Sequence, residues 1–237
     1  LDIYCANYGP GAKNVLYRNN GDGSFSDVTD LAGVGDLSWS WMGVWADVNG
    51  DNLQDLYVVN GRVGNWVPYF NEANIYAEPD QLFRGLGNGK FEESNAPGGL
   101  ATTHYGAGRG AAFGDYDNDG DVDIAIVNNR GGLRLLRNGA PKVGNWLQLS
   151  VLGPAGSDAL GARVRITAGS ATYHRLIQTA YSFCSANDPR AHVGLGAAAQ
   201  ADEVRVDWLI GEPELFGPLD AGKSYTLVQG EGRQAPN

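Results

Sequence analysis

The stretch DYDNDGDVD, residues 115–123, holds five carboxylates in nine positions. Like charges this close together repel one another, so the stretch favours a cation bound between them. Asp115, Asp117 and Asp119 come at alternate positions of a tight turn, and Asp123 can complete the ligand shell from the next element. Oxygen donors without any Cys or His among them favour Ca²⁺ over zinc. The stretch therefore predicts a calcium loop.

Two more residues of this loop have predicted roles. Asp121 is expected to offer its backbone carbonyl to the ion, and Gly120 supplies the positive φ that the turn needs. The spacing begins like that of an EF-hand, but Ile126 stands at the twelfth position, where that motif has a bidentate Glu. Short apolar runs at 110–114 and 124–127 predict strands rather than helices on both sides of the loop.

The same spacing occurs a second time in the chain, which argues against a merely solvated acidic turn. Residues 47–55 read DVNGDNLQD, and an apolar run at 56–59 follows, as expected for another strand. We call residues 47–55 the first loop and residues 115–123 the second loop. An Asn at the third position lowers the charge of the first loop, so we expect the second loop to bind Ca²⁺ more tightly. The predicted ligands of the first loop are Asp47, Asn49, Asp51, Leu53 and Asp55.

The composition predicts a globular all-β protein. The chain of 237 residues is 43% hydrophobic and 19% charged, which is typical of a globular core, and no long amphipathic helical pattern occurs. Its 35 glycines and 10 prolines indicate many tight turns. The net charge of −10 argues against nucleic acid or an anionic membrane surface as partner. Membrane insertion is not expected, because no apolar run approaches the roughly 18 residues of a span, and no signal peptide remains.

The two cysteines, Cys5 and Cys184, stand in no metal-ligand or redox spacing. They could pair, but we favour two buried free thiols. Weakly binding calcium loops suit a compartment in which the ion is plentiful. We therefore expect a secreted, periplasmic or cell-surface protein.

Three segments, at 2–7, 55–60 and 123–128, align with one another and mark three copies of a repeat. Asp2 then takes the ninth position of a third, truncated calcium loop, and the sequence begins inside a repeat. The copies are 53 and 68 residues apart, which fits four-stranded propeller blades. Second strands are predicted at 15–18, 81–84 and 134–137, with glycine hairpins at 20–25 and 86–91.

The second copy carries an insertion between Asn60 and Leu82. The repeat does not require the aromatic residues that the insertion contains, so they form either a ligand surface or a small satellite core. These residues are Trp66, Tyr69, Phe70 and Tyr76.

These repeats resemble FG-GAP/VCBS repeats, the calcium-bearing blades of integrin α-subunit propellers and of many bacterial secreted proteins. The resemblance covers roughly residues 1–140, and GAAFGD at 110–115 is similar to the phenylalanine-glycine signature of the repeat. Propellers of this type close with about seven blades. The resemblance therefore implies a partial calcium-binding β-propeller, which needs upstream blades or other subunits to complete it.

A different β domain is predicted for residues 145–230, where the calcium pattern is absent. The motifs GARV at 161–164, DPRAH at 188–192 and GLG at 194–196 resemble the ASPIC/UnbV domain that follows such repeats in the cartilage acidic protein family. We expect a β-sandwich-like fold. Its alternating stretches are 145–151, 162–166, 174–177, 204–208 and 225–228.

Several residues that could suggest catalysis have simpler interpretations. His174 and His192 lie in predicted strands, where a structural histidine is favoured. Glycine-rich residues 106–110 precede a strand rather than a helix, so a blade turn is favoured over a phosphate loop. Trp39 and Trp41 share one face of a strand and are expected to pack between blades.

We therefore expect a non-catalytic extracellular calcium-binding module that binds protein or carbohydrate, for adhesion or surface assembly. The alternative is a propeller-borne lyase or hydrolase acting on extracellular polysaccharide. Convergence of polar side chains around His104 and Arg109 would favour that alternative.

Overall fold

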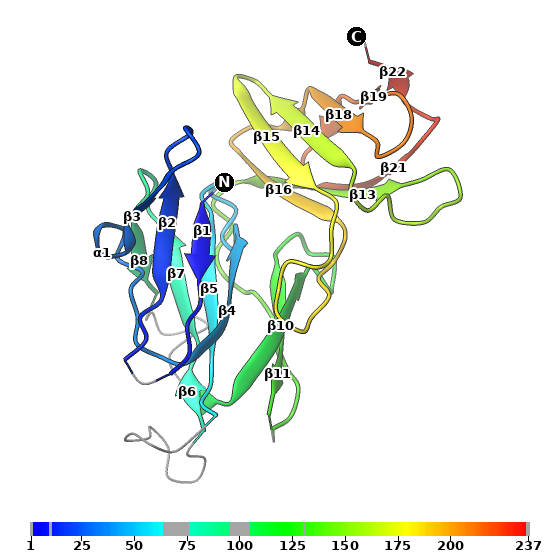
Figure 1. Ribbon diagram of the computed structural model, residues 1–237. Coiled ribbons are helices and arrows are strands. Elements are labelled where there is room, and N and C mark those ends of the chain that lie inside the picture. Colours follow the sequence, from blue (N-terminus) through cyan, green and yellow to red (C-terminus); the bar gives the residue numbers. More distant parts are fainter. Residues whose placement is uncertain (1, 10, 64–75, 95–104, 130, 236–237) are drawn as a thin grey trace.

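The computed structural model describes residues 2–9, 11–63, 76–94, 105–129 and 131–235 (Figure 1). Within these residues the secondary structure is almost entirely β, with a single four-residue helix, α1 (Thr29–Ala32). The all-β prediction is confirmed. No helix in the described part of the chain has the length and apolar character needed to cross a membrane.

Three antiparallel sheets lie side by side in the N-terminal part of the molecule (Figure 1), with strand orders β1-β2-β3, β4-β5-β7-β8 and β10-β11-β12. The middle sheet has the four strands expected of a propeller blade. A short pairing of β6 with β9 links the second and third sheets. The bounds are β1 Ile3–Cys5, β2 Val15–Asn19, β3 Phe25–Asp27, β4 Ser40–Ala46, β5 Asp55–Asn60, β6 Glu78–Pro79, β7 Gln81–Gly85, β8 Phe91–Glu93, β9 Tyr105–Gly106, β10 Gly108–Gly114, β11 Asp123–Asn128 and β12 Arg134–Leu136.

Strand β5 shows why the sheets stack face to face. All six of its residues are buried, and alternate side chains of a strand point to opposite faces. Leu56 and Val58 pack into the core shared with β2, whereas Tyr57 and Val59 pack into the core shared with β10 and β11. A strand covered on both faces needs a continuous apolar run, which is what the sequence has at 56–59.

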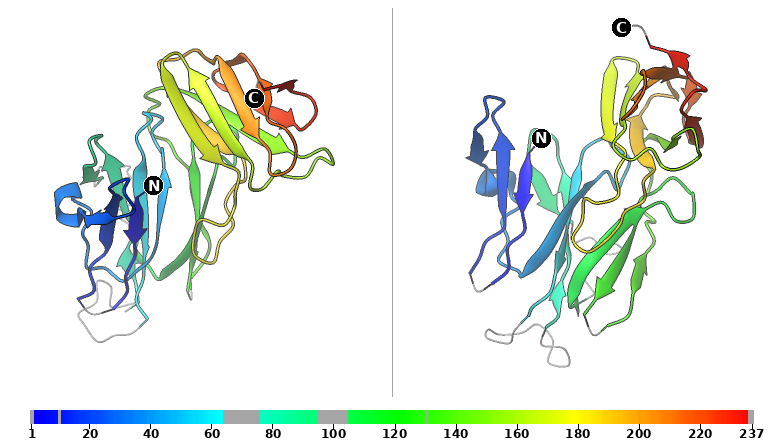
Figure 2. Two further views of the ribbon diagram at one scale, coloured as in Figure 1. Left: turned by 45° about the horizontal axis from the view of Figure 1, so that its top comes forward. Right: turned by 45° about the vertical axis from the view of Figure 1, so that its right-hand side comes forward.

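The C-terminal part is a two-layered sandwich (Figure 2). One sheet has the order β16-β13-β21 and the other β15-β14-β18-β19-β22, with β17 and β20 paired beside them. Buried aliphatic side chains from both sheets form a single core. The bounds are β13 Asn145–Leu152, β14 Arg163–Ala168, β15 Ala171–Leu176, β16 Ala191–Gly196, β17 Gln200–Ala201, β18 Glu203–Asp207, β19 Glu214–Phe216, β20 Leu219–Asp220, β21 Lys223–Val228 and β22 Arg233–Gln234.

A long segment of the C-terminal domain, residues 177–190, runs back along β10 (Figures 1 and 2). The Asp188 N–H donates to the Phe113 carbonyl at 3.0 Å, and the Phe113 N–H donates to Oδ1 of Asn187 at 2.9 Å. The Phe183 ring lies 5.5 Å from that of Trp41. Backbone pairing and aromatic contacts therefore join the two domains, which the sequence pattern did not predict.

Two expectations about local environment are wrong. Cys5 and Cys184 are free, but Cys184 is exposed and Cys5 only half-buried, so they are not buried thiols. Residues 106–110 lie mostly in β9 and β10 rather than in a blade turn. Glycine is needed there for close packing, since a Cβ on Gly108 would lie 2.6 Å from a methyl group of Val59.

Candidate metal centre

The two loops occupy the same place in their sheets and share one backbone framework. The first loop connects β4 to β5, and the second connects β10 to β11. Positive φ angles occur at the fourth and sixth positions of both loops, with values of 74° and 71° in the first and 58° and 91° in the second. Gly and Asn adopt such angles most readily. These residues are Gly50, Asn52, Asn118 and Gly120.

The carboxylate at the first position accepts hydrogen bonds from backbone N–H groups within its own loop. Asp47 accepts hydrogen bonds from the N–H groups of the fifth and sixth residues at 3.1 and 3.0 Å. Asp115 accepts from the corresponding groups of its own loop at 3.1 and 2.9 Å. The loops therefore fold on backbone hydrogen bonds to a buried carboxylate, as Asx-type turns do.

The carboxylate at the ninth position ties the loop to its neighbouring strand. Asp123 accepts from the N–H groups of Tyr116 and Asn138, at 3.1 and 2.7 Å. Asp55 accepts from the two equivalent N–H groups of its repeat, at 3.0 and 2.8 Å. Asp2 accepts from the N–H of Asn19, which aligns with Asn138. In all three aligned segments, the Asp at the ninth position thus accepts a hydrogen bond from the same backbone position of its repeat.

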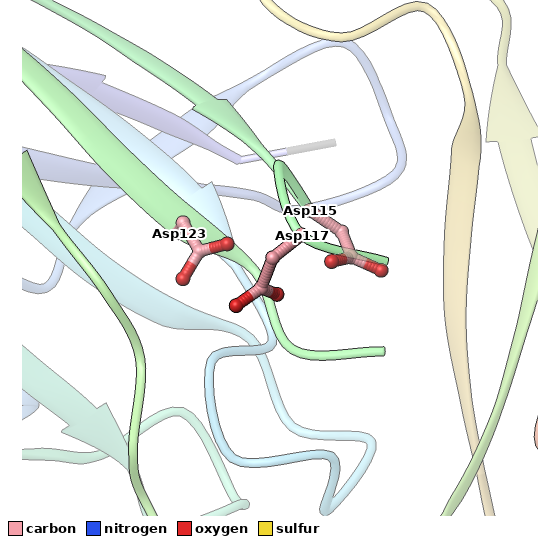
Figure 3. Close-up of side chains that lie close together, drawn as sticks. All are labelled: Asp115, Asp117 and Asp123. Carbon is pink, nitrogen blue, oxygen red and sulfur yellow. The ribbon is translucent and has the colours of Figure 1, made fainter. Parts of the chain in front are cut away.

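In the second loop, three carboxylates converge (Figure 3). Asp115, Asp117 and Asp123 each offer an oxygen, and these oxygens lie within 4.8 Å of one another. A single Ca²⁺ with bonds of about 2.4 Å reaches ligands separated by up to about 5 Å. Asp115 and Asp123 are almost fully buried. The donor set, three carboxylates with no nitrogen or sulfur, therefore fits a hard cation such as Ca²⁺.

The remaining acidic residues of the second loop face basic side chains instead. Asp119 lies 2.9 Å from Arg137, which also contacts Asp117 at 2.7 Å. The Asp121 carboxylate lies 3.6 Å from Nζ of Lys142. The structure therefore does not bring Asp119 into the three-carboxylate group, although the sequence predicts it as a ligand.

The first loop has a looser arrangement of its oxygens. Within the described ranges, Asp47, Asp51 and Asp55 do not form a three-carboxylate group of the kind found in the second loop. Asn49 donates from Nδ2 to Asp51 Oδ2 at 2.9 Å, which holds Asp51 within the loop. The Leu53 N–H donates to the other oxygen of Asp51. At the third position, the first loop therefore has an Asn that hydrogen-bonds another loop residue, whereas the second loop has a carboxylate that joins the three-carboxylate group.

Burial raises the pKa of several of these carboxyl groups. It raises the pKa of Asp55 to about 6 against the opposing effect of two backbone hydrogen bonds. Burial also raises the pKa values of Asp47 and Asp123. For Asp119, hydrogen bonds from the backbone and from Arg137 outweigh burial and lower the pKa. The buried carboxylates thus carry an electrostatic cost that a bound cation would offset.

Of the residues that could suggest catalysis, His174 and His192 line one cavity of about 430 Å³ together with Arg175, Tyr181 and Arg190, whereas Arg109 lies elsewhere. Arg109 donates to the carbonyls of Gly61, Arg62 and Gly108 and lies 4.3 Å above the Trp41 ring. His104 lies outside the described residues. His174 is exposed on β15, and His192 is half-buried on β16. The lyase or hydrolase alternative therefore stays a prediction.

The predicted aromatic surface falls largely outside the described residues. Trp66, Tyr69 and Phe70 all lie in the undescribed range 64–75. Tyr76 is half-buried and lines a cavity of about 170 Å³ together with Arg109. The expectation that these aromatics bind a ligand therefore stays a prediction.

Two sequence families match separate parts of the chain. The FG-GAP-like repeat matches residues 1–58 and 73–126, and the domain described as ASPIC and UnbV matches residues 153–234.

Similar proteins include cartilage acidic protein 1 of Homo sapiens, at 28% identity, and those of Xenopus tropicalis and Mus musculus, both at 27%. Each alignment covers 87% of this chain, but only 38% of the human relative and 39% of the other two. This chain therefore spans about two fifths of the length of these relatives. It carries FG-GAP-like repeats followed by a domain described as ASPIC and UnbV.

Proposed function

We propose that the chain is an extracellular, non-catalytic module that is stabilised by Ca²⁺ and binds protein or carbohydrate partners. The observation that carries the calcium proposal is the convergence of Asp115, Asp117 and Asp123 at the junction of β10 and β11. These three residues would hold the ion, and the first loop would hold a second one with its Asp and Asn oxygens.

The ion would supply positive charge at a point where buried carboxylates meet. Asp123 belongs to β11, whereas Asp115 directly follows β10. An ion between them would therefore connect two neighbouring strands of one blade. The extracellular placement rests on the similarity to cartilage acidic protein 1 and on the abundance of Ca²⁺ outside cells.

Thermal unfolding with and without chelator tests the calcium proposal. A ligand at a hundred times its Kd stabilises the folded state by about 2.7 kcal/mol, which corresponds to a rise of roughly 5–10 °C in Tm for a chain of this size. The variant Asp117→Ala should lose most of that rise. The exposed Asp158 provides a control, since Asp158→Ala should behave like the wild type. An identical Tm in calcium and in chelator would refute calcium binding.

We also propose that a further blade, or another subunit, covers the third sheet. That sheet leaves Val127 and Leu135 about half exposed, and Leu133 beside β12 is 69% exposed. Apolar side chains grouped on one face of a sheet are typical of an interface. Sedimentation of the chain at increasing concentration tests this proposal. A strictly monomeric chain would favour upstream blades over self-assembly.

The partner-binding part of the proposal concerns the aromatic insertion. Aromatic side chains bring a large contact area at a low entropic cost, which suits a sugar ring or a protein surface. Trp66→Ala should weaken binding on a glycan or matrix-protein array and leave the calcium-dependent Tm unchanged. Equal binding by variant and wild type would remove the insertion from the proposal.

A further inference from the structure

The C-terminal domain packs against Gly120, the sixth residue of the second loop. The indole of Trp146, on β13, packs directly against Gly120, so that a Cβ at this glycine would overlap the ring. Nε2 of His192, on β16, hydrogen-bonds the Gly120 carbonyl at 2.8 Å. Because a carbonyl only accepts, Nε2 carries the proton. A side chain of the domain thus fits against a glycine of the loop.

The first loop also contacts the C-terminal domain, but here the side chain belongs to the loop and the glycines belong to the domain. Its sixth residue is Asn52, whose side-chain amide lies against β16. With the amide oxygen and nitrogen exchanged, the oxygen accepts from the Gly196 N–H at 3.0 Å and the nitrogen donates to the Gly194 carbonyl. A Cβ on Gly194 would lie 2.5 Å from Oδ2 of Asp47 and 3.2 Å from the Gly50 carbonyl. Here a side chain of the loop fits against glycines of β16.

In both loops, the sixth residue, which contacts the C-terminal domain, is also hydrogen-bonded to a candidate ligand. The N–H of Asn52 donates to Oδ2 of Asp47, and the N–H of Gly120 donates to Oδ2 of Asp115. The position of the sixth residue therefore depends on the position of the first carboxylate. A shift of that carboxylate on cation binding would therefore act on the surface that the C-terminal domain contacts.

Arg190 adds a third contact with the second loop. Its guanidinium donates to the Asp115 carbonyl and to Oδ1 of Asn118, both at 2.6 Å. Asp188 pairs with the same guanidinium at 2.6 Å and fixes its orientation. The domain therefore contacts the backbone or side chains of the first, fourth and sixth positions of this loop.

We propose that the two cation loops form the docking surface of the C-terminal domain, so that cation binding and domain docking are thermodynamically coupled. This inference rests on the calcium binding proposed above. Coupling is reciprocal: if the ion favours docking, docking raises the affinity for the ion by the same factor. The sixth residues, Asn52 and Gly120, are positioning residues and not ligands.

Two variants break the first-loop contact from opposite sides. Gly194→Ala adds a Cβ that meets atoms of the first loop at its three closest contacts, and Gly194 has no positive φ to strain. Asn52→Gly removes the amide that reaches β16, while glycine keeps the φ of 71°. Gly153→Ala is the matched control, because a Cβ there would meet only ordinary contacts at 3.7 Å or more.

Calcium titration calorimetry and small-angle X-ray scattering on the full chain test the coupling. We expect Gly194→Ala and Asn52→Gly to lower the calcium affinity of one site at least fivefold, the lower end of typical coupling. Both variants should also have a larger radius of gyration than Gly153→Ala, and chelator should expand the wild type.

The outcomes separate the two proposals. Wild-type affinity in both variants, or a radius of gyration that ignores calcium in the wild type, would overturn the coupling while calcium binding stands. No calcium heat in the wild type would instead refute the proposed function. Circular dichroism of each variant identifies any that fails to fold, and the other variant then decides.

Discussion

The first and second loops share a framework and differ in charge. In both, the first and ninth carboxylates accept the same set of backbone N–H groups. They differ at the third position, where Asn49 bonds Asp51 in the first loop but Asp117 joins a three-carboxylate group in the second. Both oxygens of the first and ninth carboxylates already accept backbone hydrogen bonds in each loop. The comparison therefore teaches that the framework is common to the two loops and that their attraction for a cation differs through other positions, above all the third.

The equivalent arginines of the two repeats sharpen this contrast. Arg137 contacts Asp117 and Asp119 of the second loop, whereas Arg84 pairs with Glu92 on the neighbouring strand. The more acidic loop thus has its own internal countercharge. The first loop has three carboxylates against five, and there the neutral Asn49 amide hydrogen-bonds Asp51.

The largest expected effect comes from the framework. Asp123→Ala removes the acceptor for two partly buried backbone N–H groups, and each unsatisfied donor costs about 1–3 kcal/mol. We expect urea unfolding in chelator to show a loss of roughly 3 kcal/mol. Asp55→Ala should lose a similar amount, since it has the equivalent contacts. A loss confined to calcium-containing buffer would mean that the carboxylates serve only the ion.

The next effect is a pH dependence of the unfolding free energy. It arises from a carboxyl group outside both loops and must be separated from the pH dependence of the loop carboxyl groups. Burial raises the pKa of Asp80 to about 6, despite its contacts with Asn60 and Arg134. Because the folded state binds this proton more tightly than the unfolded state, stability rises as pH falls from about 6 to 4 and is lost as pH rises.

The variant Asp80→Asn removes this contribution. Between pH 7 and pH 4.5 in chelator, its gain in unfolding free energy should be about 1–2 kcal/mol smaller than that of the wild type. Denaturant titrations at a series of pH values measure the difference. Equal slopes for variant and wild type would place the titration in another group.

An exchange at the third position tests whether charge alone distinguishes the loops. Asn49→Asp adds a carboxylate to the first loop, and Asp117→Asn removes one from the second. We expect the calcium affinities of the two sites to change by roughly tenfold, upward for the first loop and downward for the second. Isothermal titration calorimetry on the double variant should show the order of the sites reversed. An unchanged order would indicate that geometry outweighs charge.

The smallest effect concerns the internal countercharge. Arg137→Gln removes a cation beside Asp117 and Asp119, so calcium should bind the second loop a few-fold more tightly, and the calcium-free protein should melt slightly earlier. Arg84→Gln is the control, because its partner Glu92 belongs to no loop. Equal affinities for both variants would show that Arg137 does not compete with the ion.

Local structure could be predicted from the sequence to within a few residues. The strands predicted at 56–59 and 124–127 occur as β5 and β11, and the hairpins at 20–25 and 86–91 connect β2 to β3 and β7 to β8. Alternating or continuous apolar runs and glycine turns are short-range signals, so neighbouring residues suffice to specify them. The repeated spacing of the loops belongs to the same class of signal.

Contacts between distant segments could not be predicted in this way. No short-range pattern indicates that residues 177–190 pair with β10, that Cys184 is exposed, or that Gly120 lies under Trp146. Arg190 and His192 were part of a recognised motif, but their contacts with the second loop depend on how two domains meet.

The sequence by itself determined the β architecture, the repeats and the oxygen-rich loops, because turn geometry and strand periodicity depend on residues near one another in the chain. Only the tertiary structure decided which carboxylates converge, which of them pair with Arg137, and which groups of the C-terminal domain contact the sixth position of each loop. Those outcomes depend on the packing of elements that are far apart in sequence. Whether a position needs a glycine or a large side chain depends there on the residue that packs against it.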